Sequence, residues 1–89
     1  MKVVFASSAW ADYREWARTD PKTLWRINEL IEAARRTPFE GLGKPEALKG
    51  DLAGFWSRRI TQEHRLVYRV AGREAEQRIE IAACRHHYG

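Results

Sequence analysis

The sequence lacks the cysteines that stabilise small secreted proteins and the long apolar runs that cross membranes. Cys84 is the single cysteine among 89 residues, so no internal disulfide can form. The chain therefore need not be in an oxidising compartment. The stretch MKVVFASSAW holds only a short apolar run, whereas a secretory signal needs a longer one and a spanning helix needs about 20 residues. We expect a cytoplasmic protein that does not associate with membranes.

Motifs for metals and nucleotide cofactors are missing as well. Cys84, His86 and His87 are close in sequence, but their spacing matches no standard zinc motif, and His64 is the one other His or Cys. The stretch GLGKP lacks the spacing of a Walker loop or a dinucleotide-binding fingerprint. We therefore expect no metal and no cofactor, and we interpret Cys84 as a small buried hydrophobic residue.

The remaining composition is typical of one packed globular domain spanning residues 1–89. The chain is 44% hydrophobic and has four tryptophans, which argues against disorder, and its length suits a single core. The net charge is +4, and residues 44–89 carry nine basic and six acidic side chains. This basic excess suits a polyanion such as nucleic acid, although many solvated surfaces have a similar charge.

A short strand at KVVFA and two helices are predicted before residue 38. In SSAWADYREWARTD, apolar residues spaced by four, three and four predict one stripe along a helix. The residues of this stripe are Ala6, Trp10, Tyr13 and Ala17. A second helix is predicted along PKTLWRINELIEAARR, where Asp20 can cap the start and Thr37-Pro38 ends the helical pattern.

Three strands are predicted after a long loop. The stretch TPFEGLGKPEALKGDLAG holds four of the six glycines and no helical period, which indicates a loop of a length that is usually functional or disordered. The runs GFWSRRI, HRLVYRV and RIEIAAC each suit a strand, and their short links favour an antiparallel meander. The predicted fold class is α+β, with two helices packed on one face of a small, mostly antiparallel sheet.

Alternation along the strands predicts a face lined by arginine. In HRLVYRV, the alternate residues Leu66, Tyr68 and Val70 are expected to pack against the helices. Arg65 and Arg69 then lie on the opposite face, which the rest of the chain is not expected to cover. Arg58 and Arg59 point in opposite directions, so one of them can join Arg65. Such a face beside a glycine-rich loop suits a phosphate backbone, and an ordinary solvated sheet face would show the same pattern.

Four residues form a candidate catalytic set that needs no metal: Glu46, Arg65, His87 and Tyr88. Cleaving RNA in this way requires a base for the 2′-hydroxyl proton, an acid for the departing 5′-oxygen and a cation for the phosphoryl charge. Glutamate, histidine and arginine fill these roles near neutral pH. The residue types alone are unspecific, because a loop glutamate is usually just solvated.

Longer motifs carry a resemblance to a known family. The pattern P-F-x-G-x-G-K-P-E-x-L-K is followed by G-x-W-S-R-R-I-x-x-x-H-R-L-V-Y and then by A-C-R-x-H-Y. Together they closely resemble the YoeB (Txe) family of toxins from bacterial toxin–antitoxin pairs, within the RelE-like superfamily. The resemblance implies a fold like that of microbial ribonucleases. It also implies an mRNA endonuclease that acts in the ribosomal A site, leaves 2′,3′-cyclic phosphate and 5′-hydroxyl ends, and inhibits translation.

The resemblance implies a role for each residue of the candidate site. Glu46 would be the general base, His87 the general acid, and Arg65 would stabilise the transition state. Contacts with RNA or the ribosome are implied for Lys44, Lys49, Arg59, Arg85 and Tyr88. Within that group, Arg59 would support the phosphate and Tyr88 would stack on a base. The implied partners are mRNA, the ribosome, a YefM-like antitoxin and a second copy in a homodimer.

Two features depart from the family pattern. His86 stands where an aromatic such as tyrosine is expected, so it competes with the adjacent His87 for the acid role, and only the family pattern selects His87. The stretch AGREAEQ, residues 71–77, is longer and more charged than in close relatives, and we expect it to affect contacts with the ribosome or antitoxin, since it is distant in sequence from the candidate site residues.

Two alternative functions remain open at this point. A toxin of the same broad fold can act on a protein, as the ParE-like inhibitors of DNA gyrase do. Those relatives keep the scaffold without the set of Glu46, Arg65 and His87, so the presence of this set argues against that reading. A catalytically inactive RNA- or ribosome-binding module would carry the same residue types.

Overall fold

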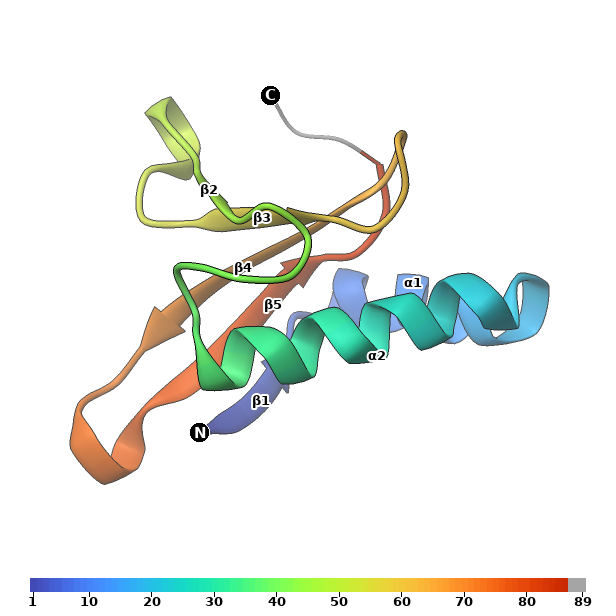
Figure 1. Ribbon diagram of the computed structural model, residues 1–89. Helices are drawn as coiled ribbons and strands as arrows, with labels where there is room; N and C mark the ends of the chain where they lie inside the picture. The colour runs from blue at the N-terminus through green and yellow to red at the C-terminus, as the bar shows by residue number, and fades with distance from the viewer. Residues whose placement is uncertain (87–89) are drawn as a thin grey trace.

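The computed structural model describes residues 1–86. Its elements are β1 (Lys2–Phe5), α1 (Ser7–Thr19), α2 (Pro21–Arg36), β2 (Glu46–Ala47), the 3₁₀ turn η1 (Gly50–Leu52), β3 (Trp56–Arg59), β4 (Arg65–Ala71), the 3₁₀ turn η2 (Glu74–Glu76) and β5 (Arg78–Ala83). Figure 1 shows α1 and α2 packed together against the sheet. The predicted fold class is confirmed. Among the described residues, no helix is long and apolar enough to cross a membrane.

The sheet has the strand order β1-β5-β4-β3-β2. As predicted, β3, β4 and β5 form an antiparallel meander, and the short β2 adds to it beside β3. Only β1 is parallel to its neighbour, β5. Both helices lie in the chain segment that joins these two strands, which is the long crossover that a parallel pair requires.

The core lies between α2 and the facing side of the sheet. Its buried members from α2, β4 and β5 are Ile27, Leu30, Ile31, Ala34, Leu66, Tyr68, Ile79 and Ile81. As predicted, α2 begins at Pro21 and is capped by Asp20, whose carboxylate accepts the Thr23 N–H at 3.2 Å. Each fully buried aliphatic side chain contributes about 1.5–3 kcal/mol, so this stripe holds α2 on the sheet.

The apolar stripe predicted for α1 is wrong. Ala9 is the buried residue of the helix, and Tyr13 and Trp16 pack against the core, whereas Trp10 is 49% exposed. Trp10 instead stacks on Tyr13, with ring centroids 5.5 Å apart, and meets Phe5 edge-on. Trp10 therefore packs on Phe5 and Tyr13 and stays half exposed. Helix α1 is rotated about its axis so that Trp16 faces the core.

The sheet face away from the helices is buried at its centre, which corrects the expectation of an uncovered face. Ser57, Val67 and Ala83 lie in register across β3, β4 and β5, and all three are buried, with Val67 only 2% exposed. Arg65 and Arg69 lie on this face at opposite ends of β4. Charged side chains therefore occupy its ends and not its middle.

A buried guanidinium holds the glycine-rich loop on the sheet. Arg58 is fully buried on the helix-facing side of β3, where its Nε donates to Tyr68 Oη at 2.9 Å. Its other nitrogens donate to the backbone carbonyls of Thr37, Glu40 and Leu42. A buried cation requires such acceptors, so this side chain ties residues 37–42 to β3.

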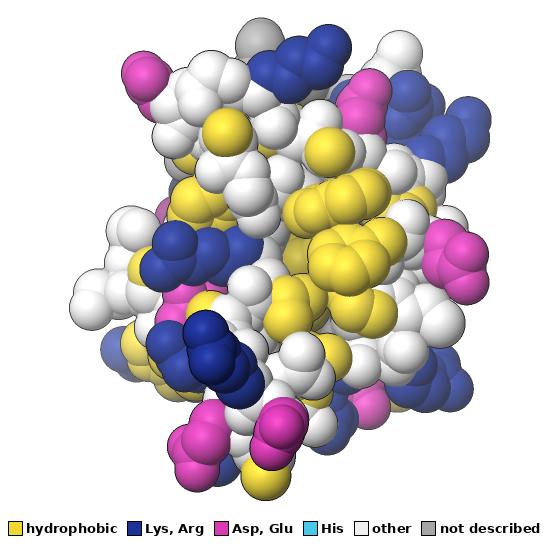
Figure 2. Space-filling model, turned by 90° about the vertical axis from the view of Figure 1, so that its left-hand side faces the viewer, with side chains coloured by type: hydrophobic (Ala, Val, Ile, Leu, Met, Phe, Trp, Pro, Cys, Tyr) yellow, Lys and Arg dark blue, Asp and Glu magenta, His cyan; other side chains and the backbone are white. Residues whose placement is uncertain are grey.

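Tyr68 completes the attachment of the loop. Its hydroxyl donates to the Pro38 carbonyl at 2.6 Å, and burial raises the pKa of Tyr68, which keeps the phenol protonated. Phe39 from the same loop packs on Trp56, with ring centroids 4.9 Å apart, and remains 55% exposed. Figure 2, which views the molecule from the left-hand side of Figure 1, shows hydrophobic side chains gathered on that surface. The loop is therefore held by both polar and apolar contacts.

The turn at residues 71–77 lies at the opposite end of β4 from Arg65 (Figure 1). Near it, Glu80 accepts hydrogen bonds from Arg69 at 2.6 Å and from Arg78 at 2.7 Å. These two guanidinium groups lower the pKa of Glu80. Arg69 also lies over the Phe55 ring at 5.1 Å, so its charge is compensated within the fold.

Replacing Arg58 with methionine should lower the free energy of unfolding by about 3 kcal/mol or more, because hydrogen bonds to charged groups contribute about 1.5–3 kcal/mol each. Urea unfolding followed by tryptophan fluorescence measures the change. Arg59→Met is the matched control, since Arg59 is exposed and such substitutions usually change stability by about 0.5 kcal/mol or less. Equal stabilities of the two variants would contradict this role.

Glu80 should make stability depend on pH. A carboxylate with a lowered folded pKa contributes stability above its unfolded pKa, and that contribution is lost as the pH falls through the folded value. Glu80→Gln should therefore be less stable than the parent near neutral pH, and the difference should shrink toward zero in acid. Urea unfolding across a pH series measures it, with Glu76→Gln as the control. A difference that is constant with pH would refute the linkage.

Candidate functional site

The candidate site lies at the end of the sheet where β3 ends and β4 begins. Arg59 and Arg65 are cross-strand partners in the β3–β4 ladder, and Glu46 is the partner of Ser57 in the β2–β3 ladder. Residues opposite one another point to the same face. Ser57 and Arg59 are two positions apart on β3, so Glu46, Arg59 and Arg65 share the face away from the helices. Arg59 is thus the arginine that joins Arg65, as one of the pair was predicted to do.

The Arg65 guanidinium is held by the turn that precedes it. Its Nη1 donates to the carbonyls of Thr61 at 2.8 Å, Gln62 at 3.1 Å and His64 at 3.1 Å. The turn forms because Thr61 Oγ1 accepts the N–H groups of Glu63 and His64. Among residues 1–86, the other guanidinium nitrogens of Arg65 have no hydrogen-bond partner. The side chain is positioned and keeps donors for a ligand.

Arg59 is exposed, and its backbone ties the loop to the end of β3. Its N–H donates to the Gly43 carbonyl at 2.7 Å. Gly43 has φ +86°, and a Cβ there would lie 2.6 Å from Leu30 Cδ2 and 3.1 Å from Arg58 Cβ. Only glycine allows so close an approach. The Arg59 side chain makes no hydrogen bond or ion pair within the described part of the chain.

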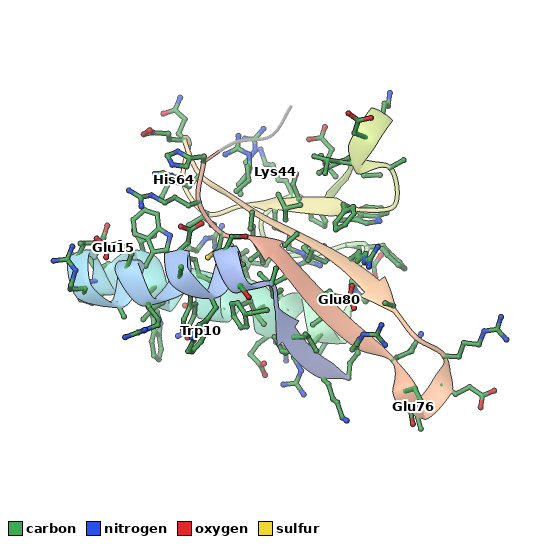
Figure 3. All side chains as sticks on the ribbon, turned by 180° about the vertical axis from the view of Figure 1, so that it is seen from behind. Trp10, Glu15, Lys44, His64, Glu76 and Glu80 are labelled. Atoms are coloured by element: carbon green, nitrogen blue, oxygen red, sulfur yellow. The ribbon has the colours of Figure 1, made fainter. Side chains whose placement is uncertain are left out.

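Three charged residues follow Gly43 in the chain: Lys44, Glu46 and Lys49. Glu46 belongs to β2, Lys44 has φ +53°, and Lys49 precedes η1. All three are exposed, and none forms an ion pair with another residue of the range 1–86. In Figure 3, Lys44 and His64 lie at the same end of the sheet. The antiparallel β2–β3 register places Glu46 opposite Ser57, with Lys44 on the Arg59 side, whereas Lys49 follows Leu48, whose N–H donates to the Phe55 carbonyl just before β3. The structure therefore brings Lys44 and Glu46 toward Arg59 and Arg65, but not Lys49.

The last described residue, His86, lies directly beside Arg65. The Arg65 N–H donates to the His86 carbonyl at 2.8 Å, and the His86 N–H donates to Nδ1 of His64 at 2.8 Å. The C-terminal segment therefore reaches the candidate site at His86. His87 and Tyr88 lie outside the described residues, so the acid and stacking roles expected of them stay predictions.

Arg85 is not brought together with the other cations. Its guanidinium lies over the Trp16 ring of α1 at 5.7 Å, and its buried Nε has no hydrogen-bond partner among the described residues. The Trp16 indole N–H donates to the Cys84 carbonyl at 2.8 Å. Cys84 itself is fully buried, and burial raises its pKa to about 12, so its thiol is inert, as its interpretation as a buried hydrophobic residue requires.

His64 is a site residue whose role sequence reasoning missed. It was weighed only as a metal ligand, and no group of three possible ligands occurs among residues 1–86. Its ring packs edge-on against Trp16 at 4.9 Å while it binds the His86 backbone. The available signals were its position directly before Arg65 and its place in the motif H-R-L-V-Y.

This arrangement offers an acceptor for a proton and donors for an anion on one surface. Adjacent strands lie about 4.8 Å apart, and Glu46 is offset from Arg65 by two residues along the strands. Their backbones are therefore separated by roughly 12 Å, with Arg59 between them. Long side chains span such a gap. A phosphodiester and its flanking sugars placed over Arg59 would lie within reach of the carboxylate and both guanidinium groups.

Comparisons with known proteins identify the family of this chain. A family model described as "YoeB-like toxin of bacterial type II toxin-antitoxin system" matches residues 5–88. Toxin YoeB of Escherichia coli strain K12 is 56% identical over 88 residues, which cover 99% of this chain and all of that protein.

Solved structures show the same likeness. A YoeB/ParE toxin from Agrobacterium tumefaciens is 61% identical and superposes with a TM-score of 0.96 over 99% of this chain and 100% of that one. A YoeB dimer and a YoeB-YefM complex, both from Staphylococcus aureus, are 43% and 42% identical, with TM-scores of 0.88 and 0.87. Each covers 99% of this chain and 98% of that one. The chain therefore belongs to the family of YoeB-like toxins of bacterial type II toxin–antitoxin systems.

Proposed function

We propose that this toxin is a ribosome-dependent endoribonuclease that cleaves mRNA in the A site and thereby inhibits translation in the cytoplasm. The observation that carries the proposal is the shared sheet face of Glu46, Arg59 and Arg65, with Arg65 held by three carbonyls of the preceding turn. A base and two cations on one exposed surface suit an RNA phosphodiester.

The reaction follows from the groups available. Glu46 takes the proton of the 2′-hydroxyl, and the 2′-oxygen attacks the adjacent phosphorus. Arg65 stabilises the charge that develops on the phosphoryl oxygens, with support from Arg59. His87 donates a proton to the 5′-oxygen as its bond to phosphorus breaks. The products are a 2′,3′-cyclic phosphate and a 5′-hydroxyl, and the mechanism requires no metal.

Contacts outside the reacting atoms would provide affinity for RNA and the ribosome. Lys44 and Lys49 are exposed on either side of Glu46, where they suit phosphate groups of mRNA or ribosomal RNA. Tyr88 would stack on a base next to the cleaved bond. Arg85, which lies on Trp16, would reach RNA only after leaving that ring, so we place it last among these contacts.

The protein partners follow from the related structures. One Staphylococcus aureus YoeB was solved with YefM and another as a dimer. We propose that this chain binds a YefM-like antitoxin, whose flexible segment folds over the toxin and displaces the C-terminal end from the site, and that it also pairs as a homodimer.

The related Agrobacterium tumefaciens structure is described as a YoeB/ParE toxin, so inhibition of DNA gyrase is the second candidate function. Glu46 and the two arginines favour the nuclease, because a protein-binding inhibitor has no need for a general base beside cations. Gyrase supercoiling assays with the purified toxin distinguish the two functions.

Substitution of the proposed catalytic residues should abolish most cleavage. Glu46→Ala and His87→Ala should each lower the single-turnover rate on programmed ribosomes by about 10²–10⁴-fold, the range for a positioned acid or base. Arg65→Ala should lower it by about 10²–10³-fold, the range for loss of one group that stabilises transition-state charge. His86→Ala should cause a far smaller loss, because its backbone hydrogen bonds do not require the imidazole. Equal losses at the two histidines would undo the assignment of the acid.

The chemistry of the cleaved ends provides a separate test. The downstream fragment should carry a 5′-hydroxyl that polynucleotide kinase labels without prior phosphatase treatment. The upstream fragment should carry a cyclic or 3′-phosphate, because the 2′-oxygen is the nucleophile. Fragments with 5′-phosphate ends would exclude the proposed mechanism.

A further inference from the structure

His64 joins two parts of the site that are far apart in sequence. Its carbonyl accepts hydrogen bonds from the N–H groups of Ile60 at 3.0 Å and Thr61 at 3.2 Å, and from Arg65 Nη1 at 3.1 Å. Its ring accepts the N–H of His86 at 2.8 Å. The residue that closes the turn around the Arg65 guanidinium therefore also binds the backbone of the C-terminal segment.

The ring of His64 is held in place from the helix side. It meets Trp16 edge-on, with centroids 4.9 Å apart and planes at 83°. Trp16 is itself fixed by its hydrogen bond to the Cys84 carbonyl. Nδ1 accepts the His86 N–H, a role that requires the tautomer with its proton on Nε2. The contact with Trp16 therefore orients the ring so that Nδ1 faces the His86 N–H.

His86 is in a conformation that needs this support. Its φ is +63°, in the left-handed region that costs a non-glycine residue roughly 1–2 kcal/mol. Two hydrogen bonds hold it there: its N–H donates to His64, and its carbonyl accepts the Arg65 N–H at 2.8 Å. A strained torsion persists only where its surroundings over-determine it. The next residue along the chain is His87.

We propose that His64 is a positioning residue of the site: it fixes the backbone at His86 against Arg65, and so sets the point beside the Arg65-bound phosphate from which the chain continues. This role rests on the proposed nuclease function. It requires no contact between His64 and RNA, because the residue acts through the His86 backbone. Loss of the Nδ1 acceptor lowers the rate of the chemical step and leaves the affinity for ribosomes unchanged.

Three substitutions of His64 separate the acceptor from the ring. Asparagine places its side-chain oxygen where Nδ1 lies, glutamine carries its oxygen one atom further along, and phenylalanine keeps a ring against Trp16 without an acceptor. His64→Gln and His64→Phe should lower the single-turnover rate on ribosomes by about 10- to 100-fold, the size expected for misplacement near 1 Å. His64→Asn should retain most of the rate. The half-saturating ribosome concentration should stay the same for all three.

A second measurement does not depend on RNA. Hydrogen exchange of the His86 amide, followed by NMR, should be slow in the parent protein and in His64→Asn. It should be faster by about tenfold or more in His64→Gln and His64→Phe, because the acceptor is lost. Urea unfolding of each variant identifies the concentration range in which all of them are folded.

The outcomes separate this inference from the function on which it rests. If the parent protein cleaves no message, the proposed function fails, and unchanged His86 exchange in all three variants would overturn the positioning role independently. If the parent cleaves and His64→Phe cleaves at the same rate, the positioning role is wrong while the nuclease stands. A change confined to the half-saturating ribosome concentration would overturn it too, since it would indicate direct binding of RNA.

Discussion

The side of the molecule that carries the candidate site depends on one buried cation. The Arg58 guanidinium has left water, and such a group is stable only where acceptors surround it. Here three backbone carbonyls of residues 37–42 and the Tyr68 hydroxyl meet it. A loop with neither helix nor ladder in this stretch thereby becomes part of the fold. Gly43 can then reach the N–H of Arg59, and β2 with Glu46 follows at the sheet edge.

On the sheet face away from the helices, the arginine side chains at one end are paired with a carboxylate and those at the other end are not. Arg69 and Arg78 share Glu80, so their charge is compensated by a carboxylate within the fold. At the other end, Arg59 and Arg65 are neighbours with no carboxylate paired to either among residues 1–86. Like charges on adjacent strands are destabilising, and a bound anion relieves that cost. The uncompensated end is therefore where a phosphate would add stability, and it is also where His64 brings the C-terminal segment.

Much of the fold could be predicted from local pattern, and the errors occurred where the pattern was ambiguous. For α2, one set of apolar residues fits a helical stripe, and that stripe is buried. For α1, aromatic residues lie on several sides, so spacing alone favoured the side with Trp10, whereas packing turned Trp16 inward. In the site, residue type, alternation and family motifs predicted Arg59, Arg65 and Glu46, which the structure places on one sheet face. His64 was not, because its role is a contact between side chain and backbone across 22 positions.

The sequence by itself determined both helices and every strand except the short β2, which lies within the predicted loop. It also determined the cap at Asp20, the opposite facing of two adjacent arginines and, through its long motifs, the family. These depend on neighbours along the chain or on spacing within one element. The tertiary structure decided which arginine is buried and which is exposed, which side of α1 meets the core, and where His86 lies relative to Arg65. Burial and hydrogen bonding depend on how each element is rotated against segments distant in sequence, and periodicity within one element carries no information about that rotation.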